Sequence, residues 1–133
     1  MGYQLLNAIE MKADGSGILE ILEGINLPFT PQRIYWIKGV PNGATRGHHA
    51  HKELRQVAVI VSGSVTIELS DHREVTEVEM KNDGKILIIE PGYWRVMKNF
   101  SSDAILMVLA DSSYDENDYI RNWDEYLGWK KNA

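Results

Sequence analysis

The stretch Gln56-Val57-Ala58-Val59-Ile60-Val61-Ser62-Gly63-Ser64-Val65-Thr66-Ile67-Glu68-Leu69 consists of two β-rich runs joined by three small residues. Apolar and β-branched residues dominate both runs, which is typical of strands. Gly63 can supply the positive φ that a tight turn often needs. We therefore predict a β-hairpin, with strands at residues 56–61 and 65–69.

Short runs of the same kind, separated by turn residues, occur on both sides of this hairpin. Two of the later corners are Asn82-Asp83-Gly84 and Pro91-Gly92. Such spacing is typical of a sandwich or barrel and not of alternating strands and helices. The further predicted strands are residues 33–38, 75–80, 86–89, 94–98 and 104–110, with weaker candidates at residues 3–9 and 18–22.

Only the end of the chain has a helical pattern. Tyr119, Trp123, Tyr126 and Leu127 fall at i, i+4, i+7 and i+8, and Asp118 is placed to cap a helix that begins there. With 133 residues the chain has room for one core. We predict an all-β fold: a single domain over residues 1–133, with a compact antiparallel barrel and a short C-terminal helix.

Charge and composition limit the partners. The chain has 14 basic and 19 acidic residues, a net charge of -5, and so no overall positive field for a nucleic-acid backbone. It has no cysteine, no apolar run of membrane-spanning length, and no signal-peptide layout in residues 1–10. We expect a cytoplasmic protein with no nucleic-acid or membrane partner, in which a local cluster of cations meets any bound anion.

Three of the four histidines lie in the segment Arg46-Gly47-His48-His49-Ala50-His51-Lys52. Because strand side chains alternate between faces, His49 and His51 share one face of a strand and His48 lies on the other. Two imidazoles on one face can be metal ligands, an acid/base pair, or polar residues at an open edge. The spacing by itself leaves these three possibilities open.

The wider pattern resembles the two motifs of the cupin superfamily. Gly43-x5-His49-x-His51-x4-Gln56-x6-Gly63 is similar to the first, and Gly84-x5-Glu90-Pro91-Gly92-x2-Arg95-x3-Asn99 to the second. Metal cupins usually have a glutamate at the position of Gln56 and a histidine at that of Arg95. A guanidinium has no lone pair for a metal, and two imidazoles rarely complete a divalent site. We therefore expect no metal, and a polar cavity that accommodates these side chains.

A closer resemblance rests on the histidine segment together with the tail Tyr119-Ile120-Arg121-Asn122-Trp123-Asp124-Glu125-Tyr126-Leu127. Both are similar to the nucleotide-sugar 3,4-ketoisomerases, metal-independent cupins that act on dTDP-4-keto-6-deoxyglucose. The resemblance implies a homodimeric, cofactor-free isomerase that moves the keto group from C4 to C3, for biosynthesis of 3-amino-3,6-dideoxy sugars of surface polysaccharides. In a dimer, the weak strand at residues 3–9 could pair with a neighbour's sheet.

One departure from the family lies near the N-terminus. Where the family often has Asp-x-Arg-Gly, this chain has Asp14-Gly15-Ser16-Gly17. A serine hydroxyl cannot replace the charge of a guanidinium. This difference bears on the exact substrate or on the configuration at C4 of the product, and less on the class of reaction.

The reaction requires removal of the C3 proton, an enediol intermediate and return of a proton at C4. By resemblance His49 is the expected base and His51 its partner or second proton donor. Tyr35 could donate a hydrogen bond to the developing enediolate. A dTDP diphosphate needs a local set of cations, and an aromatic ring can stack on thymine. The expected substrate-binding residues are Arg33, Arg46, Lys52, Gln56, Trp94, Arg95, Tyr119 and Arg121.

Three alternatives remain open at this point. A cofactor-free 3,5-epimerase would use a histidine base on the same keto-sugar and leave the ketone at C4. A non-catalytic module would bind the sugar nucleotide without turnover. A metal-dependent cupin would contain stoichiometric metal. The two histidines in the acid/base arrangement favour the isomerase over the non-catalytic module.

Overall fold

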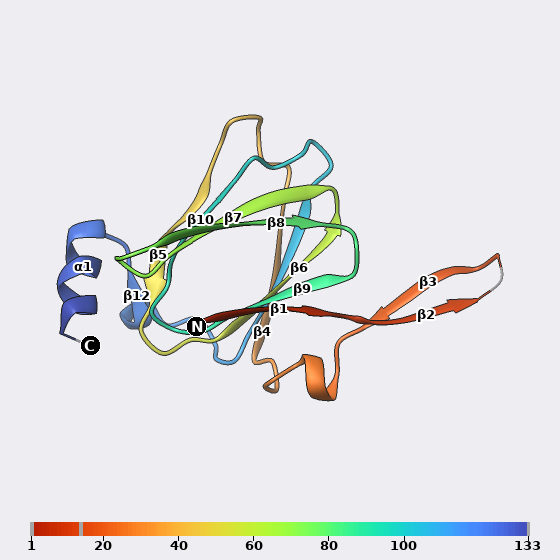
Figure 1. Ribbon diagram of the computed structural model, residues 1–133, viewed down its shortest axis with the longest axis horizontal. Helices are drawn as coiled ribbons and strands as arrows, with labels where there is room; N and C mark the ends of the chain where they lie inside the picture. The colour runs from red at the N-terminus through yellow and green to blue at the C-terminus, as the bar shows by residue number, and fades with distance from the viewer. Residues whose placement is uncertain (1, 14, 133) are drawn as a thin grey trace.

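Two five-stranded antiparallel sheets face each other and form a barrel in the structure, a computed structural model that describes residues 2–13 and 15–132 (Figure 1). One sheet has the order β1-β9-β6-β11-β4 and the other β12-β5-β10-β7-β8. This confirms the predicted all-β fold. The strands of the first sheet are β1 (Tyr3–Asn7), β9 (Lys85–Ile89), β6 (Gln56–Ser62), β11 (Ile105–Ala110) and β4 (Arg33–Lys38). Those of the second are β12 (Tyr119–Ile120), β5 (Arg46–His51), β10 (Trp94–Lys98), β7 (Ser64–Ser70) and β8 (Val75–Lys81).

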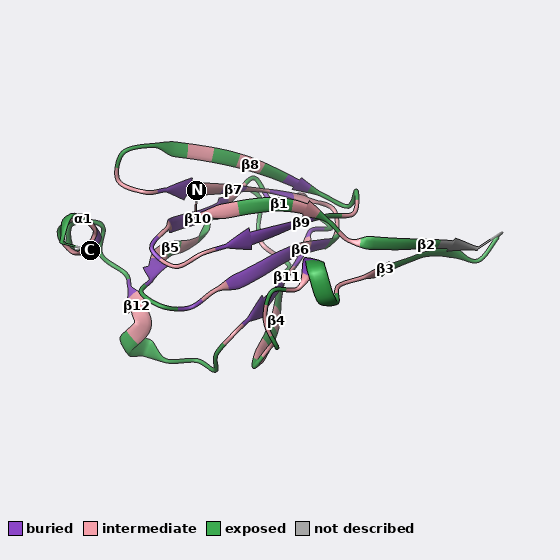
Figure 2. Cartoon of the chain, turned by 60° about the horizontal axis from the view of Figure 1, so that its bottom comes forward, coloured by how far each residue is buried: buried purple, intermediate pink, exposed green. Residues whose placement is uncertain are grey.

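The two strands predicted at the centre of the sequence are present as β6 and β7, but the predicted hairpin is wrong: β6 pairs with β9 and β11 in one sheet, and β7 pairs with β8 and β10 in the other. Gly63 has φ 70°, and a Cβ there would lie 2.2 Å from Ser101 Oγ, so glycine is needed for the turn and for the close approach. Alternate side chains of both strands enter the core between the sheets, where Ala58, Ile60 and Ile67 are buried. Most of β6 has the buried colour in Figure 2. The strong β pattern of this segment thus predicts both strands and the turn, but not their partners, because strand pairing depends on residues far apart in sequence.

The C-terminal helix begins later than the sequence predicts. Helix α1 spans Trp123–Lys131, and Asn122 caps it by accepting a hydrogen bond from the backbone N–H of Glu125. The prediction of Asp118 as N-cap is wrong, because its carboxylate binds other groups, described below. Tyr119 is also outside the helix, in the short strand β12.

A two-stranded hairpin, β2 (Ile9–Ala13) and β3 (Gly17–Ile21), projects from the barrel at the end opposite α1 (Figure 1). The weak strand predicted at residues 3–9 is divided at Ala8, whose backbone N–H donates to Gly84 O over 2.7 Å. Its first part, β1, pairs with β9 of the same chain, so the exchange expected for this strand is not needed for its pairing. Ser16 is exposed in the turn of the projecting hairpin, and Asp14 lies outside the described residues.

No helix among residues 2–13 and 15–132 is both long enough and apolar enough to cross a membrane.

Candidate active site

A β-bulge in β5 sets the direction of the histidine side chains. His49 pairs with Arg95 of β10 and Gly47 with Val96, so His48 is the extra residue, with φ 58°. Gly47 has φ 93°, and a Cβ there would lie 2.9 Å from Arg95 O, so β10 passes too close for a side chain at this position. The bulge thus keeps His48 exposed and brings His49 opposite Arg95.

His49 and His51 lie side by side, as their alternation along the strand predicts. Their ring centroids are 4.9 Å apart with the planes at 82°. Strand β12 pairs Tyr119 with His51, and the tyrosine ring contacts both imidazoles, with centroid distances of 5.0 Å to His49 and 4.4 Å to His51. His51 is fully buried, whereas His49 is partly exposed. The structure therefore joins three of the predicted site residues in one aromatic cluster.

A buried cation lies behind this cluster. Arg95 is 2% exposed, donates from Nη1 to Gln56 Oε1, and donates from Nη2 to Tyr93 O over 3.1 Å. Gln56 Nε2 in turn donates to the hydroxyl of Tyr35 over 3.3 Å. Because the Tyr35 oxygen accepts this bond, its own O–H proton is free to donate to another group. His49, Gln56 and Arg95 line one internal cavity together with Tyr35, whereas His51, which the sequence also predicts there, lines a neighbouring cleft.

The electrostatics of the site keep both imidazoles neutral. Burial, and then the charge of Arg95, lower the pKa of His49 from its ordinary value to about 4. The same two causes lower the pKa of His51 to about 2. Burial also lowers the pKa of Arg95 to about 10, which leaves it charged at neutral pH, and raises the pKa of Tyr35. At neutral pH the site therefore holds one cation, two uncharged imidazoles and a protonated phenol.

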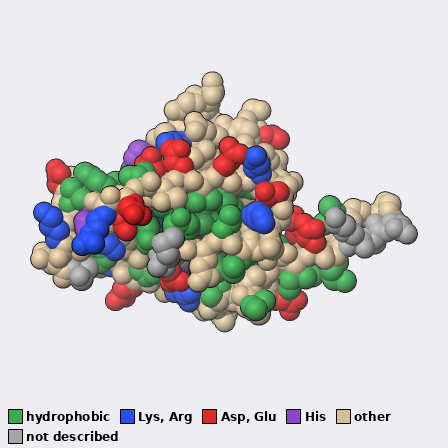
Figure 3. All heavy atoms as spheres, viewed as in Figure 1, with side chains coloured by type: hydrophobic (Ala, Val, Ile, Leu, Met, Phe, Trp, Pro, Cys, Tyr) green, Lys and Arg blue, Asp and Glu red, His purple; other side chains and the backbone are tan. Residues whose placement is uncertain are grey.

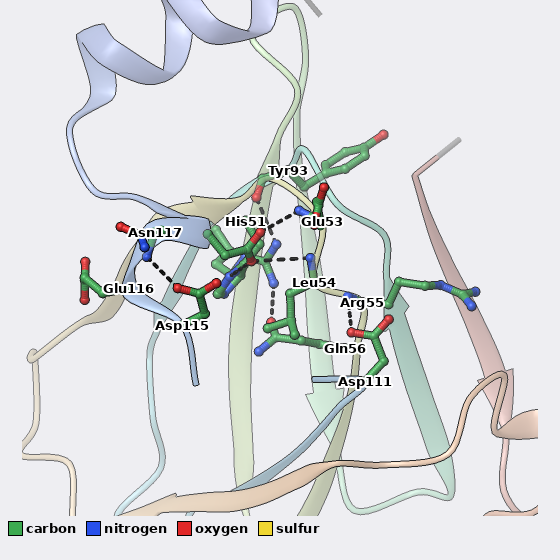
Figure 4. Close-up of polar contacts among 12 residues, drawn as sticks. His51, Glu53, Leu54, Arg55, Gln56, Tyr93, Asp111, Asp115, Glu116 and Asn117 are labelled. Atoms are coloured by element: carbon green, nitrogen blue, oxygen red, sulfur yellow. Dashed lines mark hydrogen bonds and ion pairs between the residues drawn. The ribbon is translucent and has the colours of Figure 1, made fainter. Parts of the chain in front are cut away.

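Sequence reasoning missed one residue of this site. Asp118 accepts a hydrogen bond from His51 Nδ1 through Oδ2 at 3.0 Å. Figure 4 shows His51, Glu53 and Leu54 close together at this place. The same carboxylate accepts the backbone N–H of Glu53 at 2.7 Å and that of Leu54 at 3.3 Å. Asp118 is 67 positions from His51 in sequence, and no local pattern indicates this contact. Its position directly before the tail that resembles the ketoisomerases was the only available signal.

The predicted cations are distributed unevenly around the site. Arg33 stacks over the ring of Tyr35 at 4.7 Å from its centroid, and Arg121 stacks over Tyr119 at 4.0 Å. A cleft beside the histidines is lined by Arg33, His51 and Tyr119 among others. Arg121 also donates to the carboxylate of Glu116 over 2.8 and 2.9 Å. Arg33 and Arg121 are thus held beside the cluster by aromatic rings.

The structure does not bring the other predicted binding residues to the histidines. Arg46 and Lys52 have exposed side chains at the start of β5 and just after its end, without an ion-pair partner among residues 2–13 and 15–132. Trp94 is 8% exposed and packs against Trp123 and Tyr126 of α1, with ring centroids 5.2 and 5.6 Å away. Trp94 directly precedes Arg95 on β10, and therefore the two side chains lie on opposite faces of the sheet.

The donor set does not fit a divalent metal. Metal cupins have a carboxylate and a third histidine at the positions of Gln56 and Arg95. Here these two side chains form a hydrogen bond with each other, and neither position supplies a carboxylate or an imidazole to a metal. In the part of the chain that the structure describes, no three His, Cys, Asp or Glu side chains gather as metal ligands would. The charge of Arg95 beside the imidazoles would also repel a cation.

The fold is a cupin-type barrel: two antiparallel sheets face each other, and the site contains His49 and His51 of the first motif and Arg95 of the second. Residues 1–131 match the family model described as FdtA: WxcM-like, C-terminal. The chain belongs to that family, and the resemblance to nucleotide-sugar 3,4-ketoisomerases is confirmed.

Relatives with known names agree with this assignment. The TDP-4-oxo-6-deoxy-alpha-D-glucose-3,4-oxoisomerase of Aneurinibacillus thermoaerophilus is 36% identical over 126 residues, which cover 95% of this chain and 91% of that protein. A variant of the 3,4-ketoisomerase QdtA from Thermoanaerobacterium thermosaccharolyticum, in complex with TDP-4-keto-6-deoxyglucose, is 39% identical, with a TM-score of 0.93 over 98% of this chain and 95% of that one. A 3,4-ketoisomerase from Helicobacter canadensis is 41% identical, with a TM-score of 0.93 over 98% of each chain.

Proposed function

We propose that this protein is a sugar 3,4-ketoisomerase that moves the keto group of TDP-4-keto-6-deoxyglucose from C4 to C3. The observation that carries the proposal is the pair of neutral imidazoles, His49 and His51, with ring centroids 4.9 Å apart beside the buried charge of Arg95. A neutral imidazole has a lone pair that can take a proton from carbon and later give it back. The relatives that act on or bind this substrate support the same assignment.

The geometry supports a specific division of roles. His49 is the partly exposed member of the pair, and we assign to it removal of the proton at C3. His51 is the partner that takes part in proton return at C4. Negative charge develops on the enediolate oxygens, where the free O–H of Tyr35 and the nearby charge of Arg95 stabilise it. No step in this scheme requires a metal or an organic cofactor.

The nucleotide would bind at the mouth of the site. Arg33 and Arg121 are stacked on tyrosine rings next to the histidine cluster, and a guanidinium can bind a diphosphate in bidentate fashion. Tyr119 offers a ring for stacking on thymine. Arg46 and Lys52 are exposed and would reach the diphosphate only through their flexible side chains. Because Trp94 packs under α1, we favour Tyr119 over Trp94 for contact with the base.

A homodimer is part of the proposal, and the projecting β2–β3 hairpin supports it. Among the described residues, this hairpin pairs with no strand of either five-stranded sheet, and it stands clear of the barrel (Figure 3). It exposes Met11 at 59%, Ile18 at 60% and Leu19 at 58%. Exposed apolar patches of this kind are typical of protein interfaces. A second copy is the partner that a homo-oligomer would supply.

Sedimentation equilibrium tests the dimer. Met11 and Leu19 pair across the hairpin, and replacing both with aspartate should give a monomer if this surface is the interface. Val75 on β8 is a matched control, because it is exposed at 63% outside this hairpin, and Val75→Asp should stay dimeric. A wild-type monomer at micromolar concentration would contradict the proposal.

The cellular role belongs to the same proposal. A 3-keto product is the chemical form needed before an amino group is placed at C3, which agrees with a cytoplasmic enzyme for 3-amino-3,6-dideoxy sugars of lipopolysaccharide, O-antigen or other surface polysaccharides. The reaction itself is tested by incubating the protein with TDP-4-keto-6-deoxyglucose and locating the carbonyl carbon by carbon-13 NMR. We expect a carbonyl at C3. A carbonyl that stays at C4, with altered configuration at C3 or C5, would instead identify an epimerase.

A further inference from the structure

We propose that Asp118 is a positioning residue for the isomerisation: it holds the His51 imidazole with its proton on Nδ1 and so keeps Nε2 available as a proton acceptor. This inference rests on the proposed function, because it concerns the same histidine pair. It goes beyond that function by assigning a third polar residue, from a distant part of the chain, to the acid/base machinery.

The first step is that Asp118 is itself held in place. Its Oδ1 accepts the backbone N–H of Glu53 and its Oδ2 that of Leu54, in the loop that directly follows β5. Its backbone oxygen also accepts the N–H of Lys52 over 3.0 Å. Three hydrogen bonds thus connect Asp118 to the segment that follows His51. The carboxylate therefore has little freedom to turn away from the ring.

The second step concerns the tautomer of His51. An ionised carboxylate can only accept hydrogen bonds, so the 3.0 Å contact requires that Nδ1 carry the proton. In a neutral imidazole the other nitrogen then has a free lone pair. His51 Nε2 is buried and has no hydrogen-bond partner among the described residues. A buried nitrogen without a partner needs an explanation, and a proton in transit supplies one.

The third step concerns charge. To return a proton at C4, Nε2 first takes one from solvent, which makes the ring an imidazolium, and then releases that proton to C4 while Nδ1 keeps its own. Arg95 and the neighbouring His49 and Arg121 oppose a positive charge on His51. Asp118 places a negative charge 3.0 Å from the ring and so favours the charged form. The carboxylate both orients the ring and offsets the repulsion when the proton arrives.

The wild-type protein allows a test without any substitution. Nitrogen-15 NMR distinguishes a protonated ring nitrogen from a bare one, so a long-range proton–nitrogen spectrum reports the tautomer of His51. At neutral pH we expect Nδ1 to be protonated and Nε2 to be bare. A spectrum with the proton on Nε2 would overturn the proposal even if the protein is an active isomerase.

The variant Asp118→Asn tests the functional consequence. Its amide oxygen can still accept the N–H of Glu53, while its NH2 group donates to His51 Nδ1 and forces the proton onto Nε2. We expect the nitrogen-15 signals to exchange and kcat to fall roughly 100-fold or more, the usual range for loss of an acid/base group. The dissociation constant for TDP should change less than about twofold, whereas a variant with a damaged fold would also bind TDP more weakly.

Asp71→Asn is the matched control. Asp71 Oδ1 accepts the backbone N–H groups of Arg73 and Glu74 at 3.0 and 2.9 Å, so it stabilises a turn as Asp118 does but has no histidine ring as a hydrogen-bond partner. This control should keep wild-type kcat. If Asp118→Asn exchanges the tautomer yet keeps wild-type turnover, or loses turnover only as much as Asp71→Asn does, the positioning role is wrong. A wild-type protein with the expected tautomer and no 3-keto product would instead refute the proposed function.

Discussion

The guanidinium of Arg95 donates a hydrogen bond to the side-chain oxygen of Gln56 inside the barrel. Metal cupins usually have metal ligands at these two positions, whereas here the two side chains form a hydrogen bond with each other. The bond also continues to Tyr35, which accepts from Gln56 Nε2. The same pair of substitutions that removes the metal ligands thus supplies a buried charge and an oriented phenol next to two neutral imidazoles.

The first prediction concerns metal. Exhaustive chelation should leave wild-type turnover unchanged, whereas Gln56→Glu with Arg95→His should gain measurable affinity for zinc or nickel and lose isomerase activity. The double variant supplies a carboxylate and a third imidazole beside His49 and His51, and a metal-bound nitrogen has no lone pair for a proton. Isothermal calorimetry and elemental analysis measure the binding. Loss of wild-type turnover with EDTA, restored by added metal, would make the histidines ligands instead.

The second prediction concerns the histidine pair. His49→Asn and His51→Asn should each fold and bind TDP, but lose turnover by roughly 10²–10⁴-fold, because each removes a proton-transfer group. His48→Asn is the matched control, since His48 is the exposed residue of the bulge and bonds only to Thr45 Oγ1 in the described structure. Steady-state kinetics and TDP calorimetry check the result. Wild-type rates in both site variants would remove the acid/base mechanism.

The third prediction concerns the nucleotide. Arg121→Ala should raise the dissociation constant for TDP about tenfold or more, because a charge-assisted hydrogen bond contributes roughly 1.5–3 kcal/mol. Arg46→Ala should act in the same direction. Arg73→Ala, an exposed arginine in the turn between β7 and β8, should bind TDP like the wild type. Unchanged affinity in both Arg121→Ala and Arg46→Ala would mean that the diphosphate binds elsewhere.

The fourth prediction concerns stability at acid pH. In the folded protein burial holds the pKa of His49 at about 4 and that of His51 at about 2, below the ordinary value of 6.5 that applies when the chain unfolds. The unfolded chain therefore binds more protons between pH 6.5 and pH 4, and the free energy of unfolding should fall as the pH falls. Each histidine contributes a slope of at most about 1.4 kcal/mol per pH unit.

Denaturant titrations between pH 7 and pH 4 measure this slope. The variants His49→Asn and His51→Asn should each show a shallower fall than the wild type, because each removes one group that the unfolded state protonates. The double variant His49→Asn/His51→Asn should show the shallowest fall of all. Equal slopes in all four proteins would mean that the buried histidines are not neutral in the folded state.

The alternation of side chains along a strand was enough to predict the shared face of His49 and His51, and the need for a positive φ was enough to predict the turn at Gly63. Local patterns of this kind depend only on neighbouring residues. The contact between Asp118 and His51 depends on how two segments far apart in sequence meet in the barrel. No periodicity reports such a contact, and the helix-capping preference of aspartate favoured a different interpretation.

The conformation of Tyr119 also depends on a contact between segments far apart in sequence. Its spacing from Trp123 and Tyr126 fits a helix, but pairing with His51 of β5 keeps it extended in β12, and the helix begins only after Asn122. Tertiary pairing thus overrode a local pattern. The consequence is favourable for function, because the strand conformation brings the Tyr119 ring against both histidines.

Proton exchange during turnover tests the central claim, that neutral histidines remove the proton at C3 of the sugar and return a proton taken from solvent at C4. The protein is incubated with TDP-4-keto-6-deoxyglucose in deuterated water, and the product is analysed by proton and carbon-13 NMR after many turnovers. We predict a ketone at C3 and solvent deuterium at C4. A ketone that stays at C4, or a 3-keto product whose C4 carries only the hydrogen from C3 of the substrate, would contradict this account.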